Sequence, residues 1–65
     1  MPYIKIEMFE GRDLLKKQEL VAAVTDTVSR ILEVPIEKIT VSINECKQEN
    51  WAVGGILFSN NPVPK

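Results

Sequence analysis

The chain has 65 residues, a formal net charge of −1, one cysteine and no histidine. A single domain of this size, residues 1–65, buries only about 60% of its unfolded surface and needs a disulfide, a metal or self-association for stability. Cys46 alone forms no internal disulfide, and a lone thiol without imidazoles excludes a zinc site, so we expect an oligomer. Without a basic face, a long apolar run or a signal-peptide layout, the sequence predicts a cytoplasmic protein that binds neither nucleic acid nor membrane.

The first predicted element is a strand over residues 3–9, YIKIEMF. Apolar residues alternate with Lys5 and Glu7 in this segment, and a period of two is typical of a half-buried strand. The segment Glu10-Gly11-Arg12 interrupts the alternation, and its glycine favours a turn.

The longest predicted element is a helix over residues 14–32, with Asp13 as its N-cap. Its apolar stripe has steps of three and four and consists of Leu20, Val21, Val24, Val28, Ile31 and Leu32. The charged residues that largely avoid this stripe are Lys16, Lys17, Glu19, Asp26 and Arg30. The pattern predicts an amphipathic helix of about five turns that ends at Val34-Pro35, because a residue before proline disfavours helical geometry.

The second predicted strand covers residues 39–46, ITVSINEC, where apolar and polar residues alternate again. A polar stretch follows, and the apolar run 51–58 contains the pair Gly54-Gly55, which predicts a short hairpin or extended arm. The tail at 60–65 contains two prolines and is expected to be irregular.

The order strand, long helix, strand predicts an α+β fold: a β-α-β protomer with a parallel strand pair, one long helix and a C-terminal hairpin. The helix covers one face of the sheet, and no predicted element is left to cover the other. A two-stranded sheet with an open face is not independently stable. We therefore expect the sheet to continue into, or pack against, other subunits.

A joint pattern connects these elements to a known family. Its features, in chain order, are Pro2 directly after Met1, the segment Glu10-Gly11-Arg12, a proline at position 35, a strand that contains Glu45, and Trp51 shortly before Gly54-Gly55. In this combination the chain resembles 4-oxalocrotonate tautomerase and its short relatives, over nearly its whole length to about residue 58. The resemblance implies a hexamer built from dimers, no metal or organic cofactor, and chemistry by the amine of an amino-terminal proline.

Pro2 is the candidate catalytic residue. Removal of Met1, which is usual before a small residue, leaves a secondary amine, and a free α-amino group titrates at about pH 7.7–8.0. A desolvated pocket or nearby cations lower the pKa of an amine further, which makes the neutral base available. With Met1 attached, Pro2 is a tertiary amide and no base. The alternative interpretation is an ordinary proline at the edge of a strand.

Two further residues have substrate-binding roles that the resemblance implies. Arg12 matches an arginine that binds a substrate carboxylate, and a guanidinium fork suits this geometry. Trp51 matches an aromatic wall that keeps the pocket dry. The alternatives are a solvated loop arginine and ordinary aromatic packing. The expected partner is a small-molecule carboxylate.

Thr40 is a third candidate substrate-binding residue, and here the sequence departs from the family. The best-known members carry a second arginine at this position, which polarises the substrate carbonyl. A threonine hydroxyl is neutral, and losing one preorganised donor costs about 10²–10³ in rate. A different substrate, an arginine from a partner subunit, or lost activity would each account for Thr40.

The sequence as a whole predicts a tautomerase that interconverts enol and keto forms of a small unsaturated 2-oxo acid, with Pro2 as general base, in a homo-hexamer. Two alternatives stay open. One is a hydratase or dehalogenase of the same superfamily that uses protonated Pro2 as an acid. The other is a non-catalytic or weakly active subunit of a hexamer, which can be a mixed one. A dimer also stays open as the oligomeric state.

Overall fold

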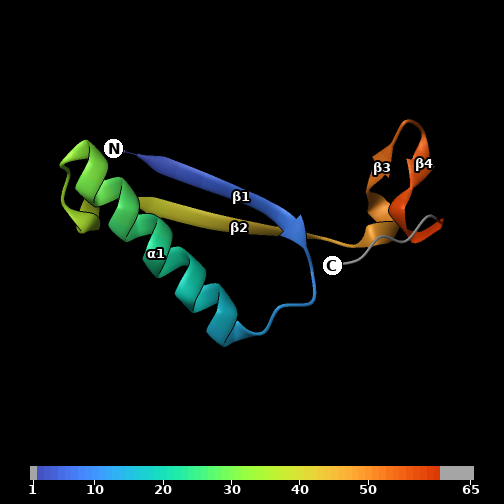
Figure 1. The fold of residues 1–65 in the computed structure, drawn as a ribbon, viewed down its shortest axis with the longest axis horizontal. Helices are drawn as coiled ribbons and strands as arrows, with labels where there is room; N and C mark the ends of the chain where they lie inside the picture. The colour runs from blue at the N-terminus through green and yellow to red at the C-terminus, as the bar shows by residue number, and fades with distance from the viewer. Residues whose placement is uncertain (1, 61–65) are drawn as a thin grey trace.

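The computed structural model describes residues 2–60, and its elements follow the predicted order (Figure 1). The helix and strands are β1 (Tyr3–Phe9), α1 (Leu14–Leu32), β2 (Thr40–Cys46), β3 (Ala52–Val53) and β4 (Ile56–Leu57). Short 3-10 helices cover Ile36–Lys38, Gln48–Asn50 and Phe58–Asn60. The predicted bounds of the first strand and the helix are confirmed, and the second strand begins one residue later than expected. Met1 and most of the expected irregular tail, 61–65, lie outside the described residues.

The predicted β-α-β fold with a C-terminal hairpin is confirmed. Strands β1 and β2 pair in parallel, from Tyr3 opposite Thr40 to Phe9 opposite Cys46, and α1 lies across one face of this pair (Figure 1). Strands β3 and β4 form a separate antiparallel hairpin beyond the carboxyl end of β2. Its two-residue turn is Gly54-Gly55, with φ values of 62° and 82°. A tight hairpin turn with positive φ at both central residues favours glycine, which explains the glycine pair.

Helix α1 ends by a backbone cap before the chain reaches Pro35. Glu33 adopts the left-handed conformation, with φ 57°, directly after the last helical residue, Leu32. The chain then closes on the last turn, because Val34 N donates to Ser29 O at 3.2 Å and Ser29 Oγ donates to Val34 O at 2.6 Å. Within residues 2–60, no helix is both long enough and apolar enough to cross a membrane.

A single chain has almost no core of its own. Among the described residues none is fully buried, and large apolar side chains such as Leu15, Ile31 and Val53 are more than 60% exposed. The accessible surface is 5169 Å² for a chain of 7.3 kDa, where a compact monomer exposes about 4,200 Å². The radius of gyration is 14.9 Å, against about 11 Å for a compact chain of this length. One chain is therefore more extended, and exposes more surface, than a compact monomer of this length.

Candidate active site

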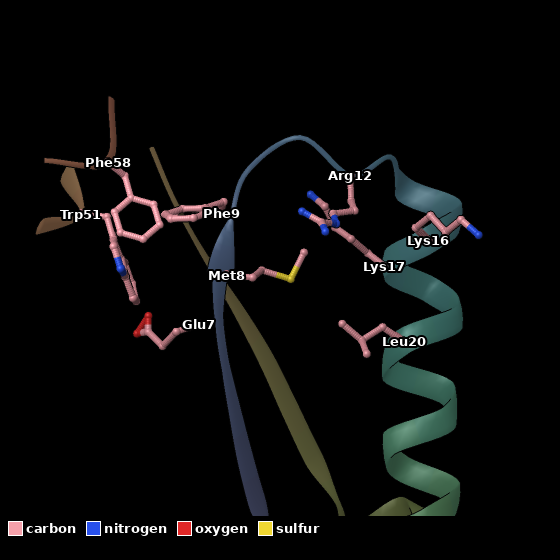
Figure 2. Close-up of a pocket in the computed structure, with 9 residues that line it drawn as sticks. All are labelled: Glu7, Met8, Phe9, Arg12, Lys16, Lys17, Leu20, Trp51 and Phe58. Atoms are coloured by element: carbon pink, nitrogen blue, oxygen red, sulfur yellow. The ribbon is translucent and has the colours of Figure 1, made fainter. Parts of the chain in front are cut away.

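A groove of about 580 Å³ lies between β1, the start of α1 and the end of the hairpin arm (Figure 2). Its lining residues are Glu7, Met8, Phe9, Arg12, Lys16, Lys17, Leu20, Trp51 and Phe58. Glu7 and Met8 are neighbours in a strand and point to opposite faces of the sheet, so the groove runs over the edge of β1. Within the described chain, β1 pairs on its other edge with β2 only. The volume is in the range of small-molecule sites.

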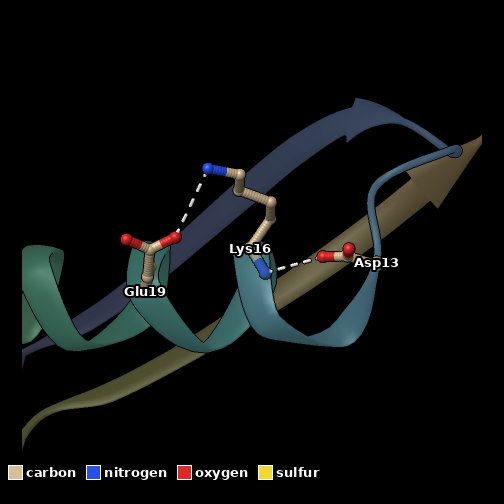
Figure 3. Close-up of polar contacts among 3 residues, drawn as sticks. All are labelled: Asp13, Lys16 and Glu19. Carbon is tan, nitrogen blue, oxygen red and sulfur yellow. Dashed lines mark hydrogen bonds and ion pairs between the residues drawn. The ribbon is translucent and has the colours of Figure 1, made fainter.

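Arg12 lies on the helix side of the groove, in the loop from β1 to α1. Gly11 has a φ of 126°, which a residue with a side chain rarely adopts, and this fixes the turn into the loop. Asp13 then caps the helix: its Oδ1 accepts from Lys16 N at 2.9 Å (Figure 3). Arg12 is exposed and forms no ion pair with any residue between 2 and 60. Its guanidinium is thus available to an anionic ligand.

The two lysines beside Arg12 are each paired with a carboxylate. Lys16 Nζ lies 3.5 Å from Glu19 Oε1, and both side chains are more than 70% exposed (Figure 3). In Figure 2 this ammonium points away from the groove, whereas Lys17 points toward Arg12. Lys17 Nζ donates to Glu45 Oε1 at 2.8 Å, with both side chains less than 30% exposed. The expectation that charged residues avoid the apolar stripe is therefore wrong for Lys17.

The opposite side of the groove is an aromatic cluster of Phe9, Trp51 and Phe58. The rings of Phe9 and Trp51 meet edge to face, with centroids 5.4 Å apart, and the centroids of Phe9 and Phe58 are 5.3 Å apart. Phe58 N also donates to Trp51 O at 2.8 Å. Such pairs contribute about 0.5–1.5 kcal/mol each beyond the burial of their area. The cluster holds the hairpin arm against the end of β1 and gives the groove an apolar wall (Figure 2).

Pro2 and Thr40 lie at the other end of the sheet. Thr40 N donates to Pro2 O at 3.1 Å, so these two predicted site residues are neighbours. Neither lines the groove. β1 has seven residues, and at about 3.3 Å per residue it separates Pro2 from the groove end by about 23 Å. One chain thus brings Arg12 and Trp51 to one groove, and Pro2 and Thr40 to the opposite end.

Several groove residues were missed by the sequence interpretation, although two of them left a signal. Lys17 precedes Leu20 and Val21 by three and four residues, which places a cation within the apolar stripe. Phe9 belongs to the face of β1 that carries Lys5 and Glu7, so it is an apolar residue at a polar position. Phe58 left no comparable signal, because only the tertiary contacts give it a partner.

The described residues contain no cluster of three or more potential metal ligands from histidine, cysteine, aspartate and glutamate. Cys46 is half-buried at the end of β2, and its Sγ donates to Lys47 O at 3.3 Å. The thiol therefore has a backbone partner, outside the groove.

Comparisons with known proteins agree on one family. The family model described as "Tautomerase enzyme" matches residues 2–61. A probable tautomerase of Listeria innocua is 43% identical over 60 residues, which are 92% of this chain and 98% of that protein. Among solved structures, a 4-oxalocrotonate tautomerase homologue is 42% identical with a TM-score of 0.85, covering 92% of this chain and 95% of its own. A heterohexameric 4-oxalocrotonate tautomerase from Chloroflexus aurantiacus is 32% identical with a TM-score of 0.84, covering 91% and 95%.

Proposed function

Since the chain belongs to the tautomerase family, we propose that it interconverts the enol and keto forms of a small 2-oxo acid. The observation that carries this proposal is the groove, which presents the guanidinium of Arg12, unpaired within residues 2–60, opposite the aromatic wall of Trp51. A guanidinium binds a carboxylate in a bidentate manner, and the aromatic side excludes water from the conjugated part of a ligand.

The proposed base is the secondary amine of Pro2 after removal of Met1. In the ketonisation direction, the amine takes the proton of the enol hydroxyl as the carbonyl forms, and the same proton is then delivered to the neighbouring carbon. No atom is gained or lost, so the reaction is an isomerisation. The pyrrolidine ring holds the nitrogen lone pair in one direction, which suits transfer between two fixed positions.

The distance between Pro2 and the groove supports a site shared between two copies of the chain. An antiparallel neighbour along the free edge of β1 would bring its own Pro2 to the end where Phe9 and Arg12 lie, because antiparallel strands place opposite ends side by side. The groove crosses this same edge. A two-fold axis there would complete two identical sites in a dimer.

The lack of a core supports further assembly of such dimers. The face of the sheet that α1 leaves open, and exposed apolar residues on α1 and on the hairpin, would gain burial from additional subunits. We propose a homo-hexamer, as the family resemblance implies, with the dimer as the smallest unit that has a complete site.

Replacing Pro2 by alanine tests the base. We expect Pro2→Ala to lower kcat/KM by about 10²–10⁴, because a primary amine in another geometry replaces the fixed ring nitrogen. The measurement is ketonisation of an enol substrate followed by ultraviolet absorbance, with intact mass to establish that Met1 is absent from both proteins. Equal rates for the two proteins would refute the role of Pro2.

The pH dependence separates this mechanism from an acid mechanism. For a base, kcat/KM rises with pH and levels off once the amine of Pro2 is neutral, whereas for an acid it falls as the amine loses its proton. A falling limb would favour the hydratase or dehalogenase interpretation instead.

A second candidate function is a subunit of a mixed hexamer whose partner supplies a missing cation. Two observations favour it: the neutral Thr40 beside Pro2, and the heterohexameric assembly of the Chloroflexus aurantiacus relative. Purification from the native host followed by native mass spectrometry distinguishes the two. A single subunit mass in the hexamer supports the homo-oligomer, and two masses support the mixed one.

A further inference from the structure

Among residues 2–60, the charges of the groove leave one cation without a carboxylate partner. Three cations line it, but the ammonium of Lys16 points outward to Glu19, and that of Lys17 is held at 2.8 Å by Glu45. The Lys17–Glu45 pair is less than 30% exposed, so water screens it less than a surface pair. Arg12 remains as the cation without a carboxylate partner among the described residues. One free guanidinium matches one carboxylate of a ligand.

The side of the groove that faces Arg12 is unsuited to a second carboxylate. Its surface consists of the Phe9, Trp51 and Phe58 rings, and the charged residue that lines the groove on this side, among those the structure describes, is Glu7, below Trp51 in Figure 2. Burying a carboxylate against apolar rings without a cation costs free energy, and a like charge adds repulsion. A flat apolar group stacks there at no such cost.

Resting on the proposed function, we propose that the groove selects 2-oxo acids with one carboxylate and a flat apolar tail over dicarboxylates, and that Glu45 sets this preference by neutralising Lys17. In the selected ligand, the carboxylate binds Arg12 and the tail lies against the aromatic cluster. Glu45 acts through Lys17 and is a positioning residue. The neutral Thr40 fits the same preference, because it adds no cation beside Pro2 for a second carboxylate.

Two simple substrates differ only in this feature. Phenylpyruvate and oxaloacetate are both 2-oxo acids, and the carbon next to the carbonyl carries a phenyl ring in one and a carboxylate in the other. The quantity to measure is the ratio of kcat/KM for enol-oxaloacetate to kcat/KM for enol-phenylpyruvate. We expect this ratio to be about 0.1 or lower in the wild-type protein. A tenfold difference is about what one buried polar group without a partner would cost in binding.

Three variants test the role of Glu45. Glu45→Gln releases the charge of Lys17 and should raise the ratio by about threefold to tenfold. Lys17→Gln leaves Glu45 as an unpaired anion and should lower the ratio. Arg30→Gln removes a cation from the far end of α1 and should leave the ratio unchanged. If the pair is merely structural, Glu45→Gln and Lys17→Gln break it alike and change the ratio in the same direction, which would overturn the proposal.

A binding measurement separates this proposal from the tautomerase proposal. Trp51 is the single tryptophan of the chain, so its fluorescence reports directly on the groove. We expect 3-phenylpropionate to quench it at about tenfold lower concentration than succinate, whether or not the protein catalyses a reaction. Tighter binding of succinate would refute the charge preference even in an active enzyme. Preferential binding of 3-phenylpropionate without turnover would sustain the preference and refute the tautomerase activity. The wild-type comparison also holds if a variant does not fold.

Discussion

The two ends of the parallel strand pair differ in what one chain supplies. At the carboxyl end, the loop before α1 and the hairpin arm after β2 converge, so one protomer builds most of a groove with a cation on one side and aromatic rings on the other. At the amino end, Pro2 and Thr40 lie side by side, joined by a hydrogen bond of 3.1 Å, and neither lines that groove. The groove end of β1 and the proposed base, Pro2, are thus about 23 Å apart.

The difference shows that one chain holds Arg12 and Trp51 at one end of the strand pair, and Pro2 and Thr40 at the other. Because β1 is an extended strand of seven residues, Pro2 at its beginning lies far from the loop that follows its end. In the proposed oligomer, the surfaces that a compact monomer would bury in its core are buried between copies of the chain instead. Under this proposal, a substitution at either end of the strand pair should change both the catalytic activity and the oligomeric state.

Mixing two impaired variants tests whether the two ends belong to different chains of one site, and it has the largest expected effect. Pro2→Ala should lose about 10²–10⁴ of kcat/KM, and Arg12→Ala about tenfold to 100-fold through a lost charge-assisted contact. Refolding an equal mixture should restore about a quarter of the wild-type activity, because half of the dimers are mixed and each has one intact site. Size-exclusion chromatography establishes that the mixture assembles. No recovery would mean that both residues act within one chain.

Removing one ring from the aromatic cluster tests the role of the groove at the carboxyl end of the strand pair. Phe58→Ala removes a ring that lies 5.3 Å from Phe9 and loosens the hairpin arm. We expect kcat/KM for an aryl substrate to fall by about threefold to tenfold, with a change in the fluorescence of Trp51. Ser59→Ala, at the next position, is the matched control. Equal effects of the two substitutions on kcat/KM would mean that the ring of Phe58 makes no specific contribution to the aromatic wall.

Removing the helix cap should have the smallest effect. Asp13→Ala deletes the acceptor for Lys16 N and should lower the free energy of unfolding by about 1 kcal/mol. A thermal melt followed by circular dichroism should show a Tm lower by about 4–8 °C at a fixed protein concentration. Asp26→Ala, on the exposed side of α1, is the control. An unchanged Tm would mean that the loop around Arg12 is fixed by other contacts, such as those between subunits.

Much of the fold was predictable because its signals are local. The alternation around Lys5 and Glu7 predicted β1, the three-and-four spacing from Leu20 to Leu32 predicted α1, and the glycine pair at 54 and 55 predicted the hairpin. Arg12 and Trp51 both line the groove, and their roles in substrate binding remain predictions. Their identification depended on a family pattern, because periodicity alone gives no reason to connect residues so far apart in the sequence.

The sequence by itself determined the elements, their order and the need for more surface burial than one chain provides. Only the tertiary structure decided that Phe9, Trp51 and Phe58 form one wall, that Glu45 neutralises Lys17, and that Pro2 lies far from Arg12. The physical reason is the separation along the sequence over which each interaction acts. Backbone preferences and apolar periodicity act over a few residues, whereas the pairing of β1 with β2 brings together segments nearly forty positions apart and sets which side chains meet.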